Sequence, residues 1–441
     1  MDSELTPQDF TVPTLGPATF RSPLGLSTVV GDGLGDFVPH GARVLYQVET
    51  EPGRTLRTDL MMERAGPREM IFFEPSQCKA AIVTCGGLCP GLNNVIRSIF
   101  LQLHHRYGVP TVLGIRYGYQ GLNPAKGPPP LLLTPEYVER IHNQGGTVLR
   151  SSRGPEDPAV IVDYLQSQGI NLLFCIGGDG TQRGTHAIAM EVHRRGAAIA
   201  VVGIPKTIDN DLPFVWRSFG YGTALEKARE AINCAHTEAR GALNGIGLVQ
   251  LMGRNAGFIA AGAALASQEA NFVLIPEVRF PLEGPGGFLD ALQKRIVARQ
   301  HAVIVVAEGA GQHLFASESS ECDASGNRKL QDIGVLLREK ISRYFKAAGI
   351  AINMKYIDPS YIIRSVPANS DDALLCDAMA RHAVHAAMAG KTDLLIGLEH
   401  GQFLHIPIST AVAQKKHLSP ESEFWLRVIE STGQPAWEAG E

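Results

Sequence analysis

The stretch AIAVVGIPKTIDND, residues 198–211, joins an apolar run to a cluster of polar side chains. Residues 198–203 are apolar throughout, and a proline and charged residues follow soon after, which predicts a buried strand that ends in a loop. In open α/β sheets, ligands bind beyond the carboxyl ends of the strands. The carboxylates of Asp209 and Asp211 and the ammonium group of Lys206 therefore suit phosphate chemistry, in which one group holds charge and others hold a metal or take a proton.

Length and composition describe a globular protein with more than one domain. The chain has 441 residues, of which 44% are hydrophobic and 19% charged, so two or three domains are expected. The net charge of −4 argues against a broad basic surface for nucleic acid or membrane. Any bound anion must therefore be held by local groups of Arg and Lys.

Several features predict a cytoplasmic protein. The seven cysteines are scattered, without a CxxC pair, which fits reduced thiols. No run of residues reaches the roughly 18 apolar positions needed to span a bilayer. The N-terminal residues Asp2, Glu4 and Asp9 are unlike a secretory signal.

From residue 79 onward, short apolar runs alternate with stretches of helical spacing. Such alternation predicts an α/β fold with parallel sheets and right-handed crossovers. We expect strands at 80–84, 111–115, 172–176, 198–203, 246–251, 272–275, 303–306 and 394–397, and helices at 93–107, 184–195 and 223–240. The last strand indicates that the chain returns to an earlier sheet. Residues 1 to about 75 lack periodicity and are expected to form an extension, and 281–287 and 317–329 to form surface loops.

Two glycine-rich turns follow predicted strands. The first, GGLCPG at 86–91, precedes a helix N-terminus, where free N–H groups and the helix dipole favour an anion; a turn required only by packing explains it equally well. The second, GGDGT at 177–181, adds Asp179, which can hold Mg²⁺ directly or through water. Gly180 leaves room for a phosphate. The structural alternative is a tight turn capped by the aspartate, which two such turns on neighbouring strands make less favourable.

Other strand ends carry further polar groups. In an extended loop, Asp209 and Asp211 face the same side, so one can act as a general base while the other orients a hydroxyl or the metal; a self-capping Asx turn is the alternative. Arg254 can bind phosphate through two N–H groups, and Glu308 can accept from sugar hydroxyls. Each of these residues taken singly is more often a solvated surface residue. For Arg153, in a polar loop, a catalytic role is one reading among several.

Taken together, these motifs resemble the phosphofructokinase family. The resemblance runs from about Lys79 to Ile408 and includes, in order, GGLCPGLNN, SSRG, GGDGT, PKTIDND, MGR, the AEG around Glu308, and KYIDPSYIIR. So many motifs in the family's order are specific, and in detail they resemble its plant- and trypanosome-like branch. The resemblance implies two Rossmann-like parallel-sheet domains with the active site in the cleft between them.

The resemblance implies catalytic roles for five residues. Asp209 matches the general base that takes the proton from the 1-hydroxyl of fructose 6-phosphate, and Thr207 and Asp211 match its companions at the sugar. Arg153 and Lys206 would lie beside the bridging oxygens of the donor. Transfer of a phosphoryl group depends mainly on positioning and charge neutralisation, and these residues match both tasks.

The resemblance also implies a binding role for each remaining motif residue. Asp179 matches the Mg²⁺-associated aspartate. The nucleotide and phosphoryl site would comprise Gly86, Arg153, Gly180, Thr181 and Gly184. The sugar-phosphate site would comprise Thr207, Asp209, Asp211, Met252, Gly253, Arg254, Glu308, Lys355, Tyr361 and Arg364. In the family, some residues of this last group reach in from a neighbouring subunit, which implies a homo-oligomer, with a tetramer favoured.

The activity implied is the transfer of phosphate from Mg-ATP to fructose 6-phosphate, which gives fructose 1,6-bisphosphate and ADP in glycolysis, by an allosteric enzyme. The implied partners are these two small molecules, without nucleic acid or membrane. The implied organisation is an N-terminal extension (1–77), a nucleotide-binding domain (78–220 plus 363–412) and a fructose 6-phosphate-binding domain with the tail (221–362 plus 413–441).

Two departures from patterns of the family matter, one at Gly245 and one that concerns the donor. Bacterial members usually carry an arginine where this chain has Gly245, which puts that cross-subunit contact in doubt. Lys206 is typical of members that use pyrophosphate, whereas Gly180 is typical of those that use ATP. We give Gly180 more weight because an aspartate there would crowd and repel the α-phosphate of a nucleotide, whereas a lysine can contact either donor.

Three alternatives stay open at this point. The first is a pyrophosphate-dependent fructose 6-phosphate 1-phosphotransferase on the same fold. The second is another GGDG-type kinase that acts on NAD or lipid, which would not explain the other motifs. The third is a non-catalytic regulatory subunit; such subunits usually lose the base or the metal carboxylate, and this chain has Asp179, Asp209 and Asp211.

Overall fold

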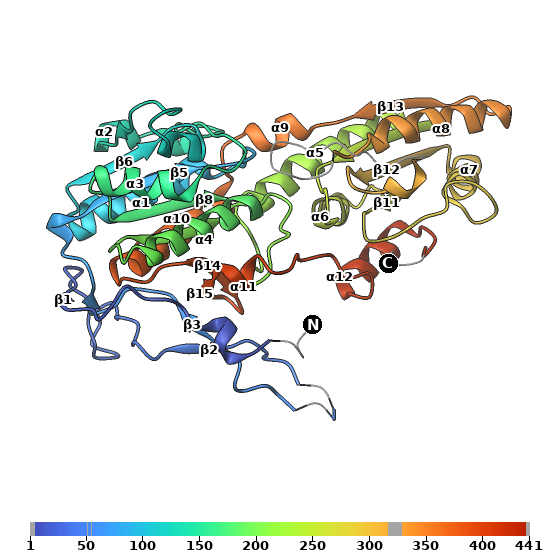
Figure 1. Cartoon of the computed structure of the whole chain (residues 1–441). Coiled ribbons are helices and arrows are strands. Elements are labelled where there is room, and N and C mark those ends of the chain that lie inside the picture. Colours follow the sequence, from blue (N-terminus) through green and yellow to red (C-terminus); the bar gives the residue numbers. More distant parts are fainter. Residues whose placement is uncertain (1–4, 51, 54, 316–328, 438–441) are drawn as a thin grey trace. The chain divides into compact units, whose positions relative to one another are not determined.

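The computed structural model describes residues 5–50, 52–53, 55–315 and 329–437. The chain divides into two compact units, coloured along the sequence in Figure 1. Unit 1 comprises Met1–Thr207, Leu212–Gly220 and Val366–Lys415, and unit 2 comprises Ile208–Asp211, Tyr221–Ser365 and Lys416–Glu441. The assignment of one substrate to each domain stays a prediction.

Unit 1 contains a nine-stranded sheet in the order β2-β3-β15-β14-β9-β8-β5-β6-β7. Its strands are β2 (Arg43–Leu45), β3 (Met61–Arg64), β15 (Gln402–Pro407), β14 (Leu394–Glu399), β9 (Ala200–Pro205), β8 (Leu172–Gly177), β5 (Lys79–Thr84), β6 (Thr111–Ile115) and β7 (Leu131–Leu132). The five strands from β14 to β6 run parallel. The strands at both edges are antiparallel to their neighbours, so the prediction of parallel pairing holds for the centre of the sheet.

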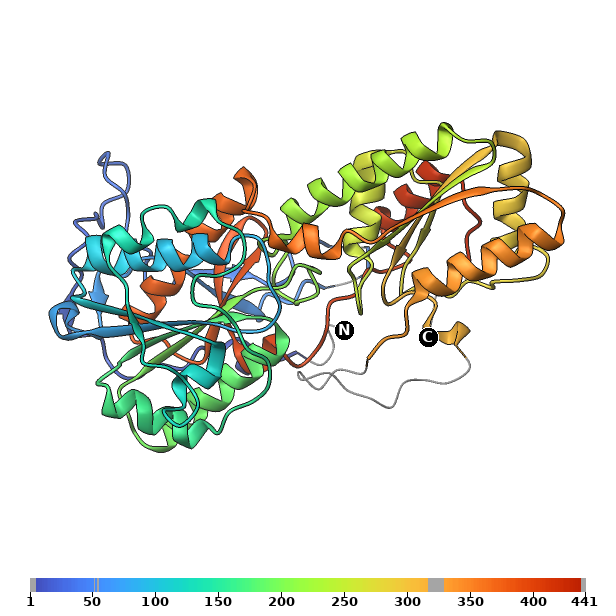
Figure 2. The same ribbon diagram turned by 90° about the horizontal axis from the view of Figure 1, so that it is seen from above.

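Helices cover both faces of this sheet, as Figures 1 and 2 show. The unit contains α1 (Leu92–Leu101), α3 (Pro158–Ser167), α4 (Asp179–Arg194) and α10 (Ser370–Met388). Side chains of α3 and α4 share one apolar core with alternate residues of β5 and β8. Every residue of β8 and β9 is buried, and α10 packs against both strands. Burial on both faces explains why these strands are continuously apolar.

The segment before residue 78 adds strands to the edge of the sheet. Strand β3 pairs with β15, and β2 pairs with β3. Two further short strands, β1 (Phe20–Arg21) and β4 (Met70–Ile71), pair with each other. The sequence pattern did not indicate these strands, because each has only two to four residues.

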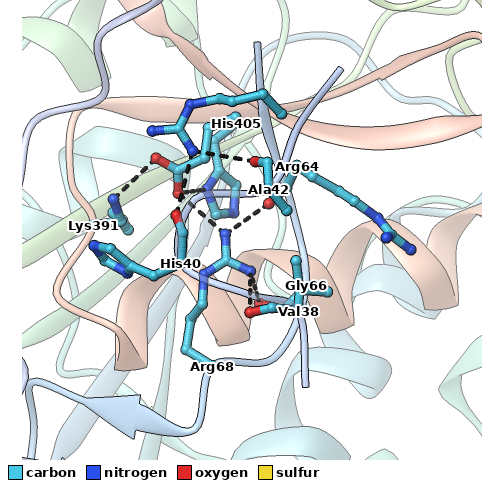
Figure 3. A network of polar contacts seen from close by, with 10 residues as sticks. Val38, His40, Ala42, Arg64, Gly66, Arg68, Lys391 and His405 are labelled. Carbon is cyan, nitrogen blue, oxygen red and sulfur yellow. Dashed lines mark hydrogen bonds and ion pairs between the residues drawn. The ribbon is translucent and has the colours of Figure 1, made fainter. Parts of the chain in front are cut away.

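A buried ion network attaches this segment to the sheet. Glu63 of β3 accepts hydrogen bonds from Arg68 Nη2 at 3.2 Å, His405 Nδ1 at 3.0 Å and Lys391 Nζ at 3.0 Å. Figure 3 shows Arg68, Lys391 and His405 gathered at this place. Burial raises the pKa of Glu63, but the hydrogen bond and charge of His405 and the charge of Lys391 hold it well below its usual range. Removal of one partner from such a network typically costs about 3–5 kcal/mol.

Unit 2 contains a four-stranded parallel sheet in the order β11-β12-β10-β13. Its strands are β11 (Phe272–Leu274), β12 (His301–Ala307), β10 (Gly245–Leu251) and β13 (Asn353–Ile357), and its main helices are α5 (Tyr221–Arg240), α6 (Phe258–Ser267), α7 (Phe288–Arg299), α8 (Ile333–Ala347) and α12 (Glu423–Thr432). Apolar side chains of α7 and α8 form one core with β10 and β12, and α5 and α6 also pack against β12.

The predicted strands are confirmed to within two residues at each end. The predicted helix start at residue 184 is wrong, because α4 already begins at Asp179. The helix expected at 93–107 continues beyond α1 as a π-helical turn, Gln102–Tyr107. Residues 281–287 form a loop, as predicted. Except for Lys329, the predicted loop at 317–329 lies outside the described residues.

Two further sequence expectations concern cysteines and membrane spans. None of the six cysteines within the described residues belongs to a disulfide, and Cys322 lies outside these residues. No helix in the described part of the chain is long and apolar enough to cross a membrane.

Candidate functional site

The carboxyl ends of β5, β8 and β9 place three of the predicted site segments at one edge of the unit 1 sheet. These strands are parallel neighbours, and they lead into the turns at Gly86, Asp179 and Lys206. The Nζ atom of Lys206 donates a hydrogen bond to Gly87 O at 2.8 Å, and a Cβ on Gly86 would lie 3.5 Å from it. The lysine side chain is therefore held against the first glycine-rich turn.

Arg153 approaches the same turn from another loop. Gly86 N donates to Ser152 O at 3.0 Å, and Ser151 Oγ donates to Gly86 O at 2.7 Å. A Cβ on Gly87 would lie 3.6 Å from Arg153 Nη2. Two cationic groups, from Lys206 and Arg153, thus flank one glycine-rich turn, an arrangement that favours an anion.

The second glycine-rich turn continues directly into α4. Asp179 is the first residue of the helix, and its Oδ1 atom lies 3.3 Å from Arg183 Nε. Thr181 is buried, and a Cβ on Gly177 would lie 2.2 Å from its Oγ1 atom. Gly180, by contrast, is exposed, and a Cβ there would meet no atom of the protein within 4 Å.

Packing explains why residue 184, which was predicted to lie in the nucleotide site, is a glycine. A Cβ on Gly184 would lie 2.7 Å from the ring of Tyr119. The hydroxyl group of Tyr119 donates to Thr181 O at 2.7 Å. Gly184 therefore lets a buried aromatic side chain support the first turn of α4.

The second glycine-rich turn fits Mg²⁺ only if water and substrate phosphates supply most of the ligands. Within the described residues, no group of three or more His, Cys, Asp or Glu side chains could hold a metal ion. Asp179 supplies one carboxylate, whose side chain is 32% exposed. Mg²⁺ commonly binds through one or two carboxylates, several waters and the phosphates of a substrate. Asp179 is suited to that kind of site and not to a closed cage of protein ligands.

The loop that contains the predicted base is not extended. Ile208 and Asp209 form a turn, and Asn210 has φ 56°, a left-handed conformation that asparagine tolerates. The premise that this loop is extended is therefore wrong, and that Asp209 and Asp211 face the same side stays a prediction. Both carboxylate residues are half-buried, and Asp211 O accepts from Lys416 N at 3.0 Å.

In unit 2, the ends of β10 and β12 bring the MGR and AEG motifs together. Glu308 N donates to Leu251 O at 2.9 Å, and Gly309 N to Gly253 O at 3.0 Å. Gly253 has φ 130°, and a Cβ there would lie 2.6 Å from a backbone oxygen. Glycine is therefore required at this position of the turn, which also presents Met252 and Arg254.

Glu308 lies in a charged and mostly buried environment. Burial raises its pKa, while the nearby guanidinium groups of Arg254 and Arg364 lower it and Asp358 raises it, with a raised pKa as the result. Arg364 belongs to α9 (Ser360–Ser365) and lies 4.6 Å above the ring of Tyr361. The structure thus places Arg254, Glu308, Tyr361 and Arg364 in one group.

Lys355 lies on a different element from the members of this group. It is exposed on the edge strand β13 and pairs with Gly247 of β10. Gly247 lies four residues before the end of β10, which corresponds to roughly 13 Å along a strand. Gly245 shows why the arginine of bacterial members is missing, since a Cβ there would lie 2.0 Å from Ala239 O.

Gln182 was not predicted as a site residue, although it lies next to the GGDGT motif. It is fully buried, and its side chain contacts the ends of two strands that carry predicted site residues. Its sequence signal is a polar residue on the apolar face of a helix. That signal is weak, because the helix was expected to begin only at residue 184.

Comparisons with known proteins agree on one family. The model of the phosphofructokinase family matches residues 79–387. The chain is 49% identical over 434 residues to an ATP-dependent 6-phosphofructokinase of Borreliella burgdorferi, with 97% of both chains covered. It is 46% identical over 376 residues to an ATP-dependent 6-phosphofructokinase of Trypanosoma brucei brucei, which covers 85% of this chain and 76% of the relative.

A solved structure with the same fold is the T-state phosphofructokinase of Pichia pastoris. The TM-score is 0.62 at 22% identity, and the match covers 76% of this chain and 35% of that chain. The chain thus spans about a third of the length of the Pichia protein, and at this identity the likeness concerns the fold alone.

Proposed function

The chain belongs to the phosphofructokinase family, and from this premise we propose that it transfers the γ-phosphoryl group of ATP to the 1-hydroxyl of fructose 6-phosphate. The products are fructose 1,6-bisphosphate and ADP. Relatives that are 46–49% identical and named ATP-dependent 6-phosphofructokinase support this activity. It makes the chain a phosphotransferase of glycolysis.

The proposal that ATP is the donor rests on the surroundings of Gly180. The side-chain position of Gly180 is open, so packing does not require glycine there. In contrast, Thr181 and Tyr119 explain the glycines at 177 and 184. Because packing does not explain the glycine at 180, we attribute it to the space that a bound ligand requires. An aspartate at this position, as the resemblance implies for pyrophosphate users, would place a negative charge where the nucleotide's α-phosphate must lie.

The reaction needs charge neutralisation and a base rather than covalent participation of the protein. Lys206 and Arg153, which flank the turn at Gly86, neutralise the phosphates of the donor. Mg²⁺, held by Asp179, waters and those phosphates, would neutralise further charge. Asp209 accepts the proton of the sugar's 1-hydroxyl as that oxygen attacks the γ-phosphorus in line.

The group around Glu308 suits a sugar phosphate. Arg254 and Arg364 offer planar guanidinium groups that bind phosphate through paired N–H donors. Glu308, close to both arginines, accepts from sugar hydroxyls. Lys355, exposed and away from this group, serves the site of a neighbouring subunit. The enzyme is then a homo-oligomer, with a tetramer favoured, and the six free thiols fit a cytoplasmic location.

A donor assay tests the proposed function. Purified enzyme with fructose 6-phosphate and Mg²⁺ should turn over with ATP much faster than with pyrophosphate. Gly180→Asp should raise the KM for ATP by about 10-fold or more, equivalent to about 1.4 kcal/mol. Gly180→Ala is the matched control and should have a much smaller effect, because it adds a methyl group without charge.

Three outcomes would contradict the proposal in different ways. Faster turnover with pyrophosphate would establish the pyrophosphate-dependent alternative. No turnover with either donor would favour a non-catalytic subunit. Equal effects of Gly180→Asp and Gly180→Ala on the KM for ATP would show that charge at this position does not select the donor.

A further inference from the structure

We propose that Gln182 is a positioning residue, which holds the turn that carries Asp179 in place relative to Lys206. This inference rests on the proposed function, since these two residues are the ones proposed to act on the donor phosphates. Gln182 touches neither substrate in this proposal. It acts through the two strand ends that its side chain joins.

The amide group of Gln182 spans two neighbouring strands. Its Nε2 atom donates to Gly177 O at 2.9 Å and to Ile204 O at 3.2 Å. Gly177 is the last residue of β8, directly before the turn that contains Asp179, and Ile204 lies two residues before Lys206. Lys206 N also donates to Gly177 O, at 3.0 Å. One carbonyl group thus accepts hydrogen bonds from the helix side chain and from the backbone of the catalytic loop.

The surrounding residues are fitted to this amide. A Cβ on Gly203 would lie 2.1 Å from Oε1 and 3.1 Å from Cδ of Gln182, so glycine at 203 provides the space that the amide occupies. The Gln182 side chain is fully buried. The reversed amide would direct its oxygen at two carbonyl oxygens, which excludes that orientation.

The amide group of Gln182 is buried although only its nitrogen atom makes hydrogen bonds with the described residues. Oε1 of Gln182 is buried and has no hydrogen-bond partner among the described residues. An unsatisfied buried acceptor destabilises the folded protein, and an apolar side chain of the same shape avoids that cost. The two bonds of Nε2 are therefore the feature that distinguishes glutamine from a methionine at this position.

Placement of the donor phosphates relative to their cations determines the rate of this type of reaction. If the two strand ends move apart by about 1 Å, turnover can fall by about 10²-fold. The sugar-phosphate group around Glu308 belongs to unit 2, whereas Gln182 belongs to unit 1. We therefore expect a loss of Gln182 to reduce kcat while the KM for fructose 6-phosphate stays nearly constant.

Gln182→Met tests this expectation, because methionine keeps the length of the side chain and removes both N–H donors. We expect kcat with ATP to fall by about 10-fold or more and the KM for fructose 6-phosphate to change by less than about 2-fold. Thermal unfolding is measured in parallel. Tyr107→Phe is the control, since it removes a buried hydroxyl group bonded to His385 Nδ1 at 2.8 Å and should lower the Tm without a change in kcat.

A double-mutant cycle separates positioning from general destabilisation. Gly203→Ala should lower kcat several-fold in the native background, because the added methyl group displaces the amide. In a Gln182→Ala background the same change should add little, since the two closest contacts are then gone and the next, with Leu395 Cβ, is at 3.2 Å. If Gln182→Met does not fold, the kcat of Gly203→Ala tests the inference by itself, since this variant retains Gln182.

The outcomes distinguish this inference from the proposed function. An unchanged kcat in Gln182→Met or in Gly203→Ala, with only the Tm lowered, would show that Gln182 has a purely structural role. Equal effects of Gly203→Ala in both backgrounds would also overturn the inference. A wild-type enzyme that does not phosphorylate fructose 6-phosphate with ATP would instead overturn the proposed function, and this inference with it.

Discussion

The predicted base depends on the backbone of its neighbour. Asn210 is 5% exposed and has φ 56°, a left-handed backbone conformation between Asp209 and Asp211. β-Branched or bulky residues are strained in this conformation. We assign the two carboxylates separate tasks, with Asp209 as the base and Asp211 as its companion at the sugar.

Asp209→Asn should reduce kcat by about 10²–10⁴-fold, because asparagine cannot take the proton of the 1-hydroxyl. The KM for fructose 6-phosphate should change much less, since the amide has nearly the same shape. Steady-state kinetics with ATP and fructose 6-phosphate measure both values. Asp211→Asn serves as the matched control and should reduce kcat less. A kcat within about 10-fold of the wild-type value in Asp209→Asn would contradict its role as the base.

Glycines in the site show what single residues of the sequence could and could not indicate. The GGDGT motif contains Gly177 and Gly180, and the resemblance assigned Gly180 and Gly184 to the nucleotide site. In the structure, neighbouring side chains require the first and the last, whereas Gly180 lies in open space. The sequence does not distinguish these cases, because Tyr119 is distant from Gly184 along the chain, and the contact of Gly177 with Thr181 depends on a helix that was expected to begin only at residue 184. For the same reason the role of Gln182 beside Gly203 was not predicted.

At the scale of elements, buried parallel strands were the most predictable part of the fold. β8 and β9 are covered on both faces, so their sequences are continuously apolar and stand out from the flanking loops. The long helix α10 was not predicted, because it is buried on several sides and lacks a clear apolar stripe; its residues Cys376 to Met388 are mostly buried. The short strands β2 and β3 depend on pairing with β15, which no local pattern reveals.

The helix α10 should make the stability of the protein depend on pH. Burial, with smaller contributions from nearby cationic groups, lowers the pKa of His382 to about 4 and of His385 to about 3. The unfolded chain therefore binds these protons more readily than the folded protein. The stabilisation is complete above about pH 6.5 and is lost as the pH falls toward 4, by up to about 1.4 kcal/mol per pH unit for each imidazole.

Denaturant unfolding between about pH 7 and pH 5 measures this slope. His382→Leu should make the dependence on pH clearly weaker, because one of the two groups no longer binds a proton. His193→Leu, at an exposed position near the end of α4, is the control and should leave the slope unchanged. If His382→Leu keeps the full slope, another group is responsible.

At the scale of the whole molecule, the position of Lys355 has a consequence for assembly. Each active site should use Asp209 of one subunit and Lys355 of another. Asp209→Asn and Lys355→Ala enzymes should each have low activity. Co-expressed as mixed oligomers, they should recover about a quarter of the wild-type activity, because one site in four combines both native residues.

Sedimentation analysis of the same samples determines the oligomeric state that this result requires. Lys355→Ala alone should raise the KM for fructose 6-phosphate, as expected for a phosphate contact. No recovery in mixed oligomers, although both variants assemble, would place Lys355 outside the site. A monomeric enzyme with full activity would contradict the shared site altogether.

The order of strands in unit 1 also has a consequence for how the protein is made. β14 lies between β9 and β15 in the sheet, yet both β14 and β15 follow residues 221–365 of unit 2 in the chain. During synthesis on the ribosome, the apolar edge of β9 stays unpaired until β14 has emerged. Strands β2 and β3 are made first but reach their partner last, since β3 pairs with β15. Unit 1 is thus begun before unit 2 and can be completed only after residues 221–365 of unit 2 have been made, so Glu63 meets Lys391 and His405 late, when only the C-terminal segment of unit 2 is still to follow.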